Sequence, residues 1–422
     1  MISNKGNNMK NKLRLVNPLI APLLSLGFIV CSSSPFTTFI SLKLQAENIT
    51  ETIIGFVHAA FYLGFLVGSI RAEKVIKRIG YIRAFSTFSA LFGFTILILS
   101  LKVNPILWMF MRFLAGLSIA EIYVIIESWL LAGSTSKTRG RILSIYMVIL
   151  YASQSFSQLF LNITPLTTTL PFIMFAILCF ASIIPVTLNY SKAPETSHEG
   201  EKITFKETYN SAPFSFFGCL ISGLLLSSIY SFLPLYAKLS NISAPYIMTI
   251  TLAGGFLLQW PLGLLSDMFN RRKVLLLISI FVFVPSFIII FLNHTITLIF
   301  SLCFMIGGFT FAIYPISITQ VCDRFDSKHI PYVIGIMSLA YSIGAIFGPI
   351  LTSLFMELTS EGIFIYIAIL SAILSFIGLY YIIKNPLITP KAEKTEFLST
   401  SGTMQLKSDL DPRTFLQENK KD

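Results

Sequence analysis

The sequence predicts an all-α membrane protein in which twelve transmembrane helices form two six-helix bundles. Three observations support this fold class. The chain is 54% hydrophobic and only 12% charged, whereas a soluble domain is about 25% charged. Its apolar residues occur in blocks of about 20, the length with which a helix crosses about 30 Å of hydrocarbon. A polar stretch near the middle divides the blocks into two equal sets.

Each apolar block is long enough for one span. The first six blocks cover residues 17–40, 52–71, 81–101, 105–131, 141–163 and 169–189. The second six cover residues 213–237, 244–266, 273–292, 296–320, 331–356 and 362–383. The predicted domains are a cytoplasmic tail at 1–16, a bundle at 17–189, a linker at 190–212, a bundle at 213–383 and a disordered tail at 384–422.

Lys and Arg are distributed unequally between the loops. Loops after even-numbered spans, the linker included, hold 16 of them, and loops after odd-numbered spans hold three. Because cytoplasmic loops carry the excess of basic residues, we expect both termini on the cytoplasmic side of a bacterial inner membrane. The net charge of +11 then reflects orientation and tails, so no nucleic-acid partner is expected.

Sequence motifs for several other functions are absent. The five cysteines show no C-x-x-C spacing and have no clustered histidines beside them, so neither a disulfide framework nor a metal site is expected. There is no P-loop, Rossmann fingerprint or G-x-S-x-G motif. The sequence therefore predicts no cofactor, and it argues against an ATP-driven pump and against an enzyme.

The two halves show a weak internal repeat. An offset of 191 residues places Gly64 over Gly255 and Gly116 over Gly307. The same offset carries the second span onto the eighth and the fourth span onto the tenth. Chance similarity between apolar helices is the alternative explanation. A true repeat would match transporters whose two halves enclose a site at the membrane midplane.

The loop after the eighth span contains a motif with a mechanical meaning. Gly263 is followed by Asp267 and then by the basic residues Arg271 and Arg272. This order resembles the signature loop of the major facilitator superfamily. Gly263 would permit close helix packing, and Asp267 would meet basic groups and help to close the cytoplasmic mouth. The alternative is that the basic residues only fix the topology.

The fourth span contains charged residues in its apolar interior. Arg112-x-x-x-Gly116 resembles the fourth-helix motif of the same superfamily, which implies an arginine that faces a cavity and takes part in proton or substrate coupling. Charges inside a span are costly unless paired or wetted, so Arg112 and Glu121 are functional candidates. The two residues lie about 180° and about 13 Å apart on the helix and cannot pair with each other. A structural acid between helices is the alternative for Glu121.

Glu127 ends the fourth span, and Arg139 precedes the fifth. The pair resembles the cytoplasmic latch of the sugar-porter branch, although the longer spacing carries over no sugar specificity. We expect Glu127 to pair with Arg139 or Arg83 in the outward-open state. The run from Glu127 to Arg141 is still more similar to an uncharacterised bacterial branch of the superfamily, which implies no known substrate.

The eleventh span contains Gly344, Gly348 and Pro349. A Gly-x-x-x-Gly pair lets helices approach closely, and the proline can bend the helix. The run resembles the fifth-helix motif associated with antiporters, but it stands in the other half. Antiport is therefore only weakly supported, and packing is the alternative.

The family resemblance implies that the first, fourth, seventh and tenth spans line the cavity. The first candidates are Tyr123, Tyr230 and Tyr314, with Gln154 from the neighbouring fifth span. Further candidates are Ser33, Ser34, Thr37, Gln158, Gln259, Trp260 and Gln320. His58 in the second span could titrate near neutrality, with a packing histidine as the favoured alternative.

These features predict a monomeric secondary transporter that moves a small organic solute across the lipid bilayer by alternating access. Coupling to protons, or to another ion, is assigned to Glu121 and Arg112. A cavity poor in charge favours neutral or amphipathic solutes, with efflux as a candidate direction. The alternatives are a transporter-like receptor that binds without translocating and a polytopic enzyme that modifies lipid.

Overall fold

The computed structural model describes residues 3–132, 136–188, 204–291, 295–325 and 329–384, with side chains from Leu19 onward except at 132, 136–140 and 331. Within these ranges the chain forms helices and turns and no β-strand. Twelve helices are long and apolar enough to cross a membrane. The predicted fold class is therefore confirmed. The predictions for residues 189–203 and 385–422 concern residues outside the described ranges.

The N-terminal bundle contains the first six spans. They are α1 (Ser3–Ala46), α2 (Glu51–Ile79), α3 (Tyr81–Leu99), α4 (Pro105–Ala132), α5 (Ser136–Ser157), continued by the 3-10 helix η1 (Gln158–Ile163), and α6 (Leu170–Ala181), continued by α7 (Ile183–Thr187). Three helices extend well beyond the spans that the sequence predicts. α1 begins inside the predicted N-terminal tail, α2 extends to Ile79 and α5 begins at Ser136, because polar turns continue a helix beyond its apolar part.

The C-terminal bundle contains the other six spans. They are α9 (Pro213–Leu239), α10 (Ala244–Met268), α11 (Arg271–Phe291), α12 (Ile296–Cys322), α13 (Ile330–Met356) and α14 (Gly362–Lys384). The short helix α8 (Phe205–Ser211) precedes them, inside the predicted linker. Thr204 and Glu207 form its capping box, and the hydrogen bonds from Thr204 hold the pKa of Glu207 below its ordinary value.

Glycines allow α2 and α4 to cross with their backbones in contact. A Cβ atom on Gly64 would collide with the carbonyl oxygen of Phe113, and a Cβ atom on Gly116 would collide with that of Phe61. The two glycines therefore sit in reciprocal positions on the two helices. Only a residue without a side chain permits this approach.

The same reciprocal crossing occurs between α10 and α12. Gly254 faces the carbonyl oxygen of Phe304, and Gly307 faces that of Thr251. α12 therefore corresponds to α4 at the expected offset of 191, but α10 corresponds to α2 at an offset of 190. The alignment of Gly64 with Gly255 was wrong by one residue, because Gly254 makes the backbone contact.

α9 and α13 form a third close crossing. Gly344 packs against the backbone of Leu220, and Gly348 packs against that of Leu224. The next residue, Pro349, presents its carbonyl oxygen to α2, where a Cβ atom on Gly55 would lie 2.8 Å away. The Gly344 to Pro349 run therefore packs within one bundle and against the other.

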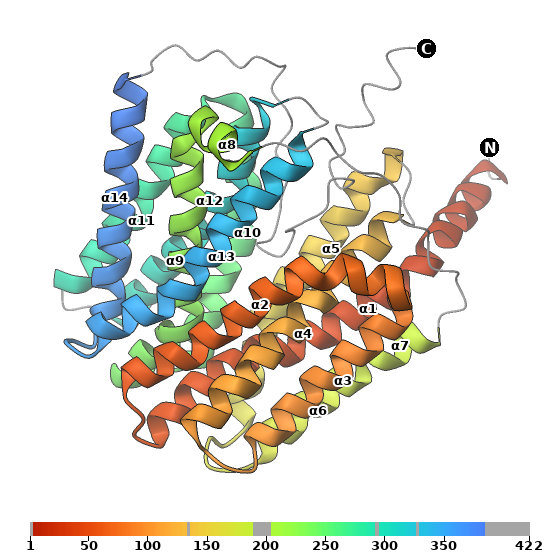
Figure 1. Ribbon diagram of the computed structural model, residues 1–422, viewed down its shortest axis with the longest axis horizontal. Helices are drawn as coiled ribbons and strands as arrows, with labels where there is room; N and C mark the ends of the chain where they lie inside the picture. The colour runs from red at the N-terminus through yellow and green to blue at the C-terminus, as the bar shows by residue number, and fades with distance from the viewer. Residues whose placement is uncertain (1–2, 133–135, 189–203, 292–294, 326–328, 385–422) are drawn as a thin grey trace.

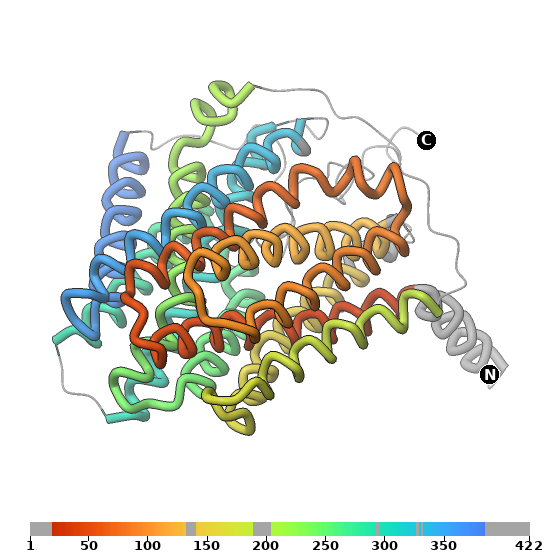
Figure 2. The backbone as a smooth tube through the Cα atoms, turned by 60° about the horizontal axis from the view of Figure 1, so that its bottom comes forward, coloured from red at the N-terminus to blue at the C-terminus, as the bar shows by residue number. Residues whose placement is uncertain are grey.

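The two bundles lie side by side, red to yellow and green to blue in Figures 1 and 2. We call the side with the ends of α1 and α9, at Ala46 and Leu239, the distal side. The opposite side, where α7 ends and α8 begins, is the linker side.

Hydrogen bonds join the bundles on the distal side. Ser155 donates from its Oγ to the Thr249 carbonyl at 2.9 Å, and Thr52 donates to the carboxylate of Glu357. The two bundles are therefore in direct contact on the distal side.

Candidate functional site

A cavity of about 130 Å³ lies between the two bundles, midway along the helices. Residues of α1, α2, α4 and α5 line it from one bundle, and residues of α9, α12 and α13 line it from the other. Six of the 18 lining residues are tyrosines, and none of the 18 is charged. The tyrosines are Tyr62, Tyr123, Tyr151, Tyr230, Tyr314 and Tyr341.

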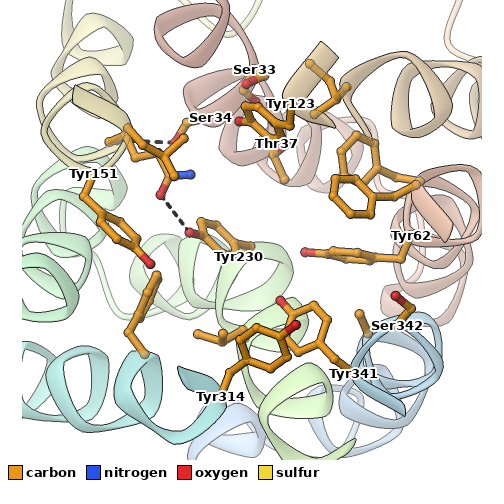
Figure 3. A pocket seen from close by; sticks show the side chains of 18 residues that line it. Ser33, Ser34, Thr37, Tyr62, Tyr123, Tyr151, Tyr230, Tyr314, Tyr341 and Ser342 are labelled. Carbon is orange, nitrogen blue, oxygen red and sulfur yellow. Dashed lines mark hydrogen bonds between the residues drawn. The ribbon is translucent and has the colours of Figure 1, made fainter. Parts of the chain in front are cut away.

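Four of these tyrosines use their hydroxyl groups within the protein. Tyr230 donates to Gln154 Oε1 at 3.1 Å, a bond between the two bundles (Figure 3). Tyr314 bonds to Ser338 at 2.9 Å. Tyr123 bonds to Ser33 and Gln154, and Tyr151 bonds to Gln259.

The hydroxyls of Tyr62 and Tyr341 have a different environment. Neither has a hydrogen-bond partner among the residues that the structure describes, and both point toward the open centre of the cavity (Figure 3). Tyr62 comes from α2 and Tyr341 from α13. The cavity therefore offers one available phenolic donor from each bundle.

The structure brings the first cavity candidates together. Tyr123, Tyr230, Tyr314 and Gln154 all line the cavity. Ser33, Ser34 and Thr37 line it as well, and Gln158 donates to Ser34 at 2.9 Å. Gln320 is buried but does not line the cavity, and Trp260 is 72% exposed on the outside of α10.

Sequence reasoning missed Tyr62, Tyr151 and Tyr341. The second and eleventh spans were not expected to supply cavity walls, and from the fifth span only Gln154 and Gln158 were expected. One signal was available, because each is a tyrosine in the middle of an apolar span, away from the interfaces where tyrosines usually gather.

Arg112 lies behind the cavity wall rather than in it. Its side chain is 1% exposed, and its guanidinium carbon lies 4.2 Å from the centre of the Phe61 ring. Phe61 itself lines the cavity. Among the described residues, Nε and Nη2 of Arg112 have no hydrogen-bond partner. A cation–π contact is therefore its main described interaction.

Glu121 is equally buried but faces another direction. The cavity residues of α4 are Ile119 and Tyr123, and Glu121 lies about 160° around the helix from them. Arg71 of α2 acts electrostatically on it, and its Oε2 has no hydrogen-bond partner within the described part of the chain. The structure therefore does not bring Glu121 together with Arg112.

Arg271 links the ends of two helices on the linker side. Its guanidinium lies 2.8 Å from Asp267 at the end of α10 and 2.8 Å from Asp323 after α12. Gly263 is buried one turn before Asp267. These ion pairs lie within the C-terminal bundle. Sequence reasoning missed Asp323 because only basic residues were counted in the loops.

Arg324 extends this cluster to α8. It donates to the carbonyl oxygen of Ser211 at the end of α8. Burial, and secondarily the nearby charge of Arg272, lower the pKa of Arg324 to about 10. The backbone N–H of Arg272 donates to Asn270 Oδ1 at 3.0 Å. The cluster ties α8 to the linker side of the C-terminal bundle.

Glu127 is buried on the linker side of the N-terminal bundle. Its Oε1 accepts a hydrogen bond from the hydroxyl of Tyr146 at 2.7 Å. Arg139 belongs to α5, but its side chain lies outside the described residues. Arg83 is exposed on α3. The observed bond joins α4 to α5.

Two bundles of six membrane helices, with a cavity lined by both, define a membrane transporter. The sequence agrees with this class. Residues 23–256 and 238–415 match the Major Facilitator Superfamily, so the chain belongs to that superfamily.

Several known proteins are similar to this chain in sequence or in structure. The uncharacterized MFS-type transporter YcaD of Escherichia coli is 30% identical over 380 residues, which cover 89% of this chain and 97% of YcaD. The nucleoside transporter NupG has a similar fold, with a TM-score of 0.72, 12% identity and coverage of 86% of this chain and 98% of NupG. A bacterial homolog of the human lysosomal transporter Spinster, solved inward-facing and unoccupied, has a TM-score of 0.68, 14% identity and coverage of 88% and 98%.

Proposed function

We propose that this protein is a proton-coupled transporter of a small neutral or amphipathic solute that contains a planar ring. The observation that carries the proposal is the cavity, which both bundles line with tyrosines and without a charged residue. Aromatic faces stack on planar rings, and apolar pockets with few polar groups bind uncharged ligands. Burying a charged solute there would leave it without a counter-charge.

Tyr62 and Tyr341 are the proposed recognition residues. Their available hydroxyls stand on opposite bundles, and each can donate to an oxygen or nitrogen acceptor on the solute. A solute that accepts hydrogen bonds from both hydroxyls touches the two bundles at once. It therefore binds more tightly to the conformation in which both hydroxyls lie near the solute. Such differential affinity is what couples binding to a conformational change.

The bias of 16 basic residues against three supports a cytoplasmic location for the linker side and both termini, in a bacterial inner membrane. The hydrogen bonds between the bundles on the distal side support an inward-facing conformation of a monomer. We propose export as the direction, because an uncharged aromatic cavity suits amphipathic solutes taken up from the cytoplasm. Glu127 would pair with Arg139 or Arg83 when the linker side closes.

Coupling is proposed to use Glu121, with Arg112 as the fixed positive charge behind the cavity. Both side chains are 1% exposed inside a span, and a buried carboxylate without a close cation is stabilised when it binds a proton. Arg71, on the linker-side part of α2, is the charged group that acts on Glu121.

Counterflow in reconstituted vesicles tests the proposed function. Vesicles loaded with unlabelled ring compounds, nucleosides among them because they combine planar rings with neutral acceptors, are diluted into trace amounts of the labelled compound. We expect labelled solute to enter loaded vesicles and not protein-free ones. Binding without exchange would favour a receptor, and a chemically altered solute would favour an enzyme; either result would contradict the proposal.

A further inference from the structure

A hydrogen-bond chain through a buried histidine joins the two bundles on the distal side. His58 of α2 lies with Nε2 2.8 Å from the hydroxyl oxygen of Ser41 on α1. Ser41 in turn donates to the carbonyl oxygen of Ser231 on α9 at 2.7 Å. Its contact with the Thr37 carbonyl in its own helix is much longer, at 3.5 Å. The chain therefore runs from α2 through α1 to the other bundle.

The direction of each bond in this chain follows from the number of hydrogens. A hydroxyl has one hydrogen, and a carbonyl oxygen can only accept. Because Ser41 gives its hydrogen to Ser231, it must accept a hydrogen from His58 Nε2. The neutral imidazole therefore carries its hydrogen on Nε2 and has a lone pair on Nδ1.

Nδ1 of His58 is enclosed but not satisfied. The side chain is 0% exposed, and Nδ1 has no hydrogen-bond partner among the described residues. A proton added at Nδ1 would create a buried N–H group without an acceptor and a buried positive charge. Both are unfavourable in an apolar environment.

The charges around His58 make a second proton still less favourable. Arg112 of α4 is the charged group that acts electrostatically on it. The groups that α1 and α9 bring to His58 are a hydroxyl and a carbonyl. α13 packs against α2 one turn away, at Gly55, with the carbonyl of Pro349 and the hydroxyl of Ser353. None of these groups offers a negative charge to compensate an imidazolium.

We propose that Nδ1 of His58 is a proton-binding site that controls the distal side of the transporter. The neutral imidazole allows the hydrogen bonds from His58 to Ser41 and from Ser41 to Ser231, and these bonds hold the bundles together. A proton from the distal solution binds the Nδ1 lone pair when the bundles separate, because water can then solvate the new N–H group. The resulting imidazolium opposes closure until the proton leaves. The proposal rests on alternating access, and it adds a titratable group to Glu121.

The test measures the separation of the bundles directly. Cysteines introduced by Thr50→Cys and Thr359→Cys, both at exposed positions on the distal side, carry the spin labels. The background is Cys31→Ala, because Cys31 is half-buried and could react with the label, whereas the other four cysteines are buried. The full chain is reconstituted in vesicles at equal pH on both sides, without solute. Between about pH 8 and about pH 5 we expect the ratio of the long to the short label distance to rise about tenfold.

Three variants make the result specific. His58→Gln keeps an N–H donor for Ser41 but cannot bind a proton, so the short distance should persist at every pH. Ser41→Ala removes the hydroxyl that links His58 to Ser231. It should therefore raise the fraction of molecules with the long label distance already at pH 8. His329→Gln changes a histidine on the linker side and should respond like the unmodified chain. A pH response that persists in His58→Gln, or no response in the unmodified chain, would overturn the proposal.

The same experiment separates this proposal from the proposed function. It uses no solute and no proton gradient, so a failure to find a transported compound leaves its outcome unchanged. Conversely, counterflow of a ring compound together with pH-independent label distances would support the transporter and reject the role of His58. Glu121→Gln should keep the distance response, because Glu121 lies on the α2 face near Arg71 and away from the chain.

Discussion

α4 and α12 occupy equivalent positions in the two bundles, but their buried residues differ in charge. Both helices use a glycine, Gly116 or Gly307, to pack against a neighbour's backbone. α4 buries Arg112, Glu121 and Glu127. At the offset of 191, the equivalent residues in α12 are Cys303, Ala312 and Ile318, which are buried and uncharged.

The two helices therefore share their packing geometry but differ in the chemical groups that they bury. The crossing geometry occurs in both bundles, so it serves the fold. Of these two equivalent helices only α4 buries charged groups, whereas available tyrosine hydroxyls come from both bundles, at Tyr62 and Tyr341. The proposed coupling residues therefore belong to the N-terminal bundle, whereas the proposed solute contacts come from both bundles.

The largest effect is expected where the bundles are alike. Gly116→Val and Gly307→Val each place a branched side chain against a backbone carbonyl that cannot move away. We expect both variants to lose most of the monodisperse protein in detergent, measured by size-exclusion chromatography. Gly27→Ala is the control, because its Cβ would lie 3.8 Å from Ser153 Oγ. If only one of the two valine variants remained monodisperse, the two glycine crossings would not be equivalent.

The linker-side loops contrast a buried and an exposed ion pair. The Arg271 and Asp323 side chains are 3% and 10% exposed, whereas those of Lys77 and Glu73 are 55% and 50% exposed. Asp323→Asn should lower the free energy of unfolding by about 3 kcal/mol, because it removes one of the two carboxylates that pair with the buried guanidinium. Glu73→Gln should change it by less than about 0.5 kcal/mol. Thermal unfolding in detergent measures both, and equal shifts would contradict the contrast.

Glu121→Gln tests whether coupling belongs to the charged helix. The amide keeps the size of the side chain but cannot release a proton, so we expect accumulation driven by a proton gradient to be abolished and counterflow to remain. Ala312→Ser, at the equivalent position of α12, should leave both activities near the unmodified level. Gradient-driven accumulation that survives in Glu121→Gln would reject the assignment.

The smallest effect is expected at the shared site. Tyr62→Phe and Tyr341→Phe each remove one hydroxyl and keep the ring, so each should weaken solute binding about tenfold. Tyr246→Phe, at an exposed tyrosine of α10, is the matched control. Competition for counterflow gives the affinities. A loss in one variant only would mean that the solute is held by one bundle.

Much of the fold follows from the sequence because a membrane imposes a simple rule. Apolar blocks of sufficient length must be helices, and the spans predicted from them are present. The glycine crossings were harder to align, since Gly254 and Gly255 are adjacent and only the backbone contact selects between them.

The candidate site was predictable in part. Tyr123, Tyr230 and Tyr314 were found because the family resemblance assigned their helices to the cavity. Tyr62 and Tyr341 were missed because the side of a helix that faces a cavity depends on its rotation. In spans that are apolar all round, periodicity does not fix that rotation. Asp323 was missed for another reason, since only the basic residues of the loops were counted and its partner Arg271 lies on a different helix.

Phe61 separates Arg112 from the cavity, and this arrangement has an electrical consequence. The ring prevents a solute from reaching the guanidinium hydrogens, but hydrocarbon screens an electric field far less than water does. Arg112 therefore contributes a positive electrostatic potential on the α2 side of the cavity, although the walls there are uncharged. This potential disfavours a cationic solute, and it favours a neutral ring that turns its electron-rich face toward α2.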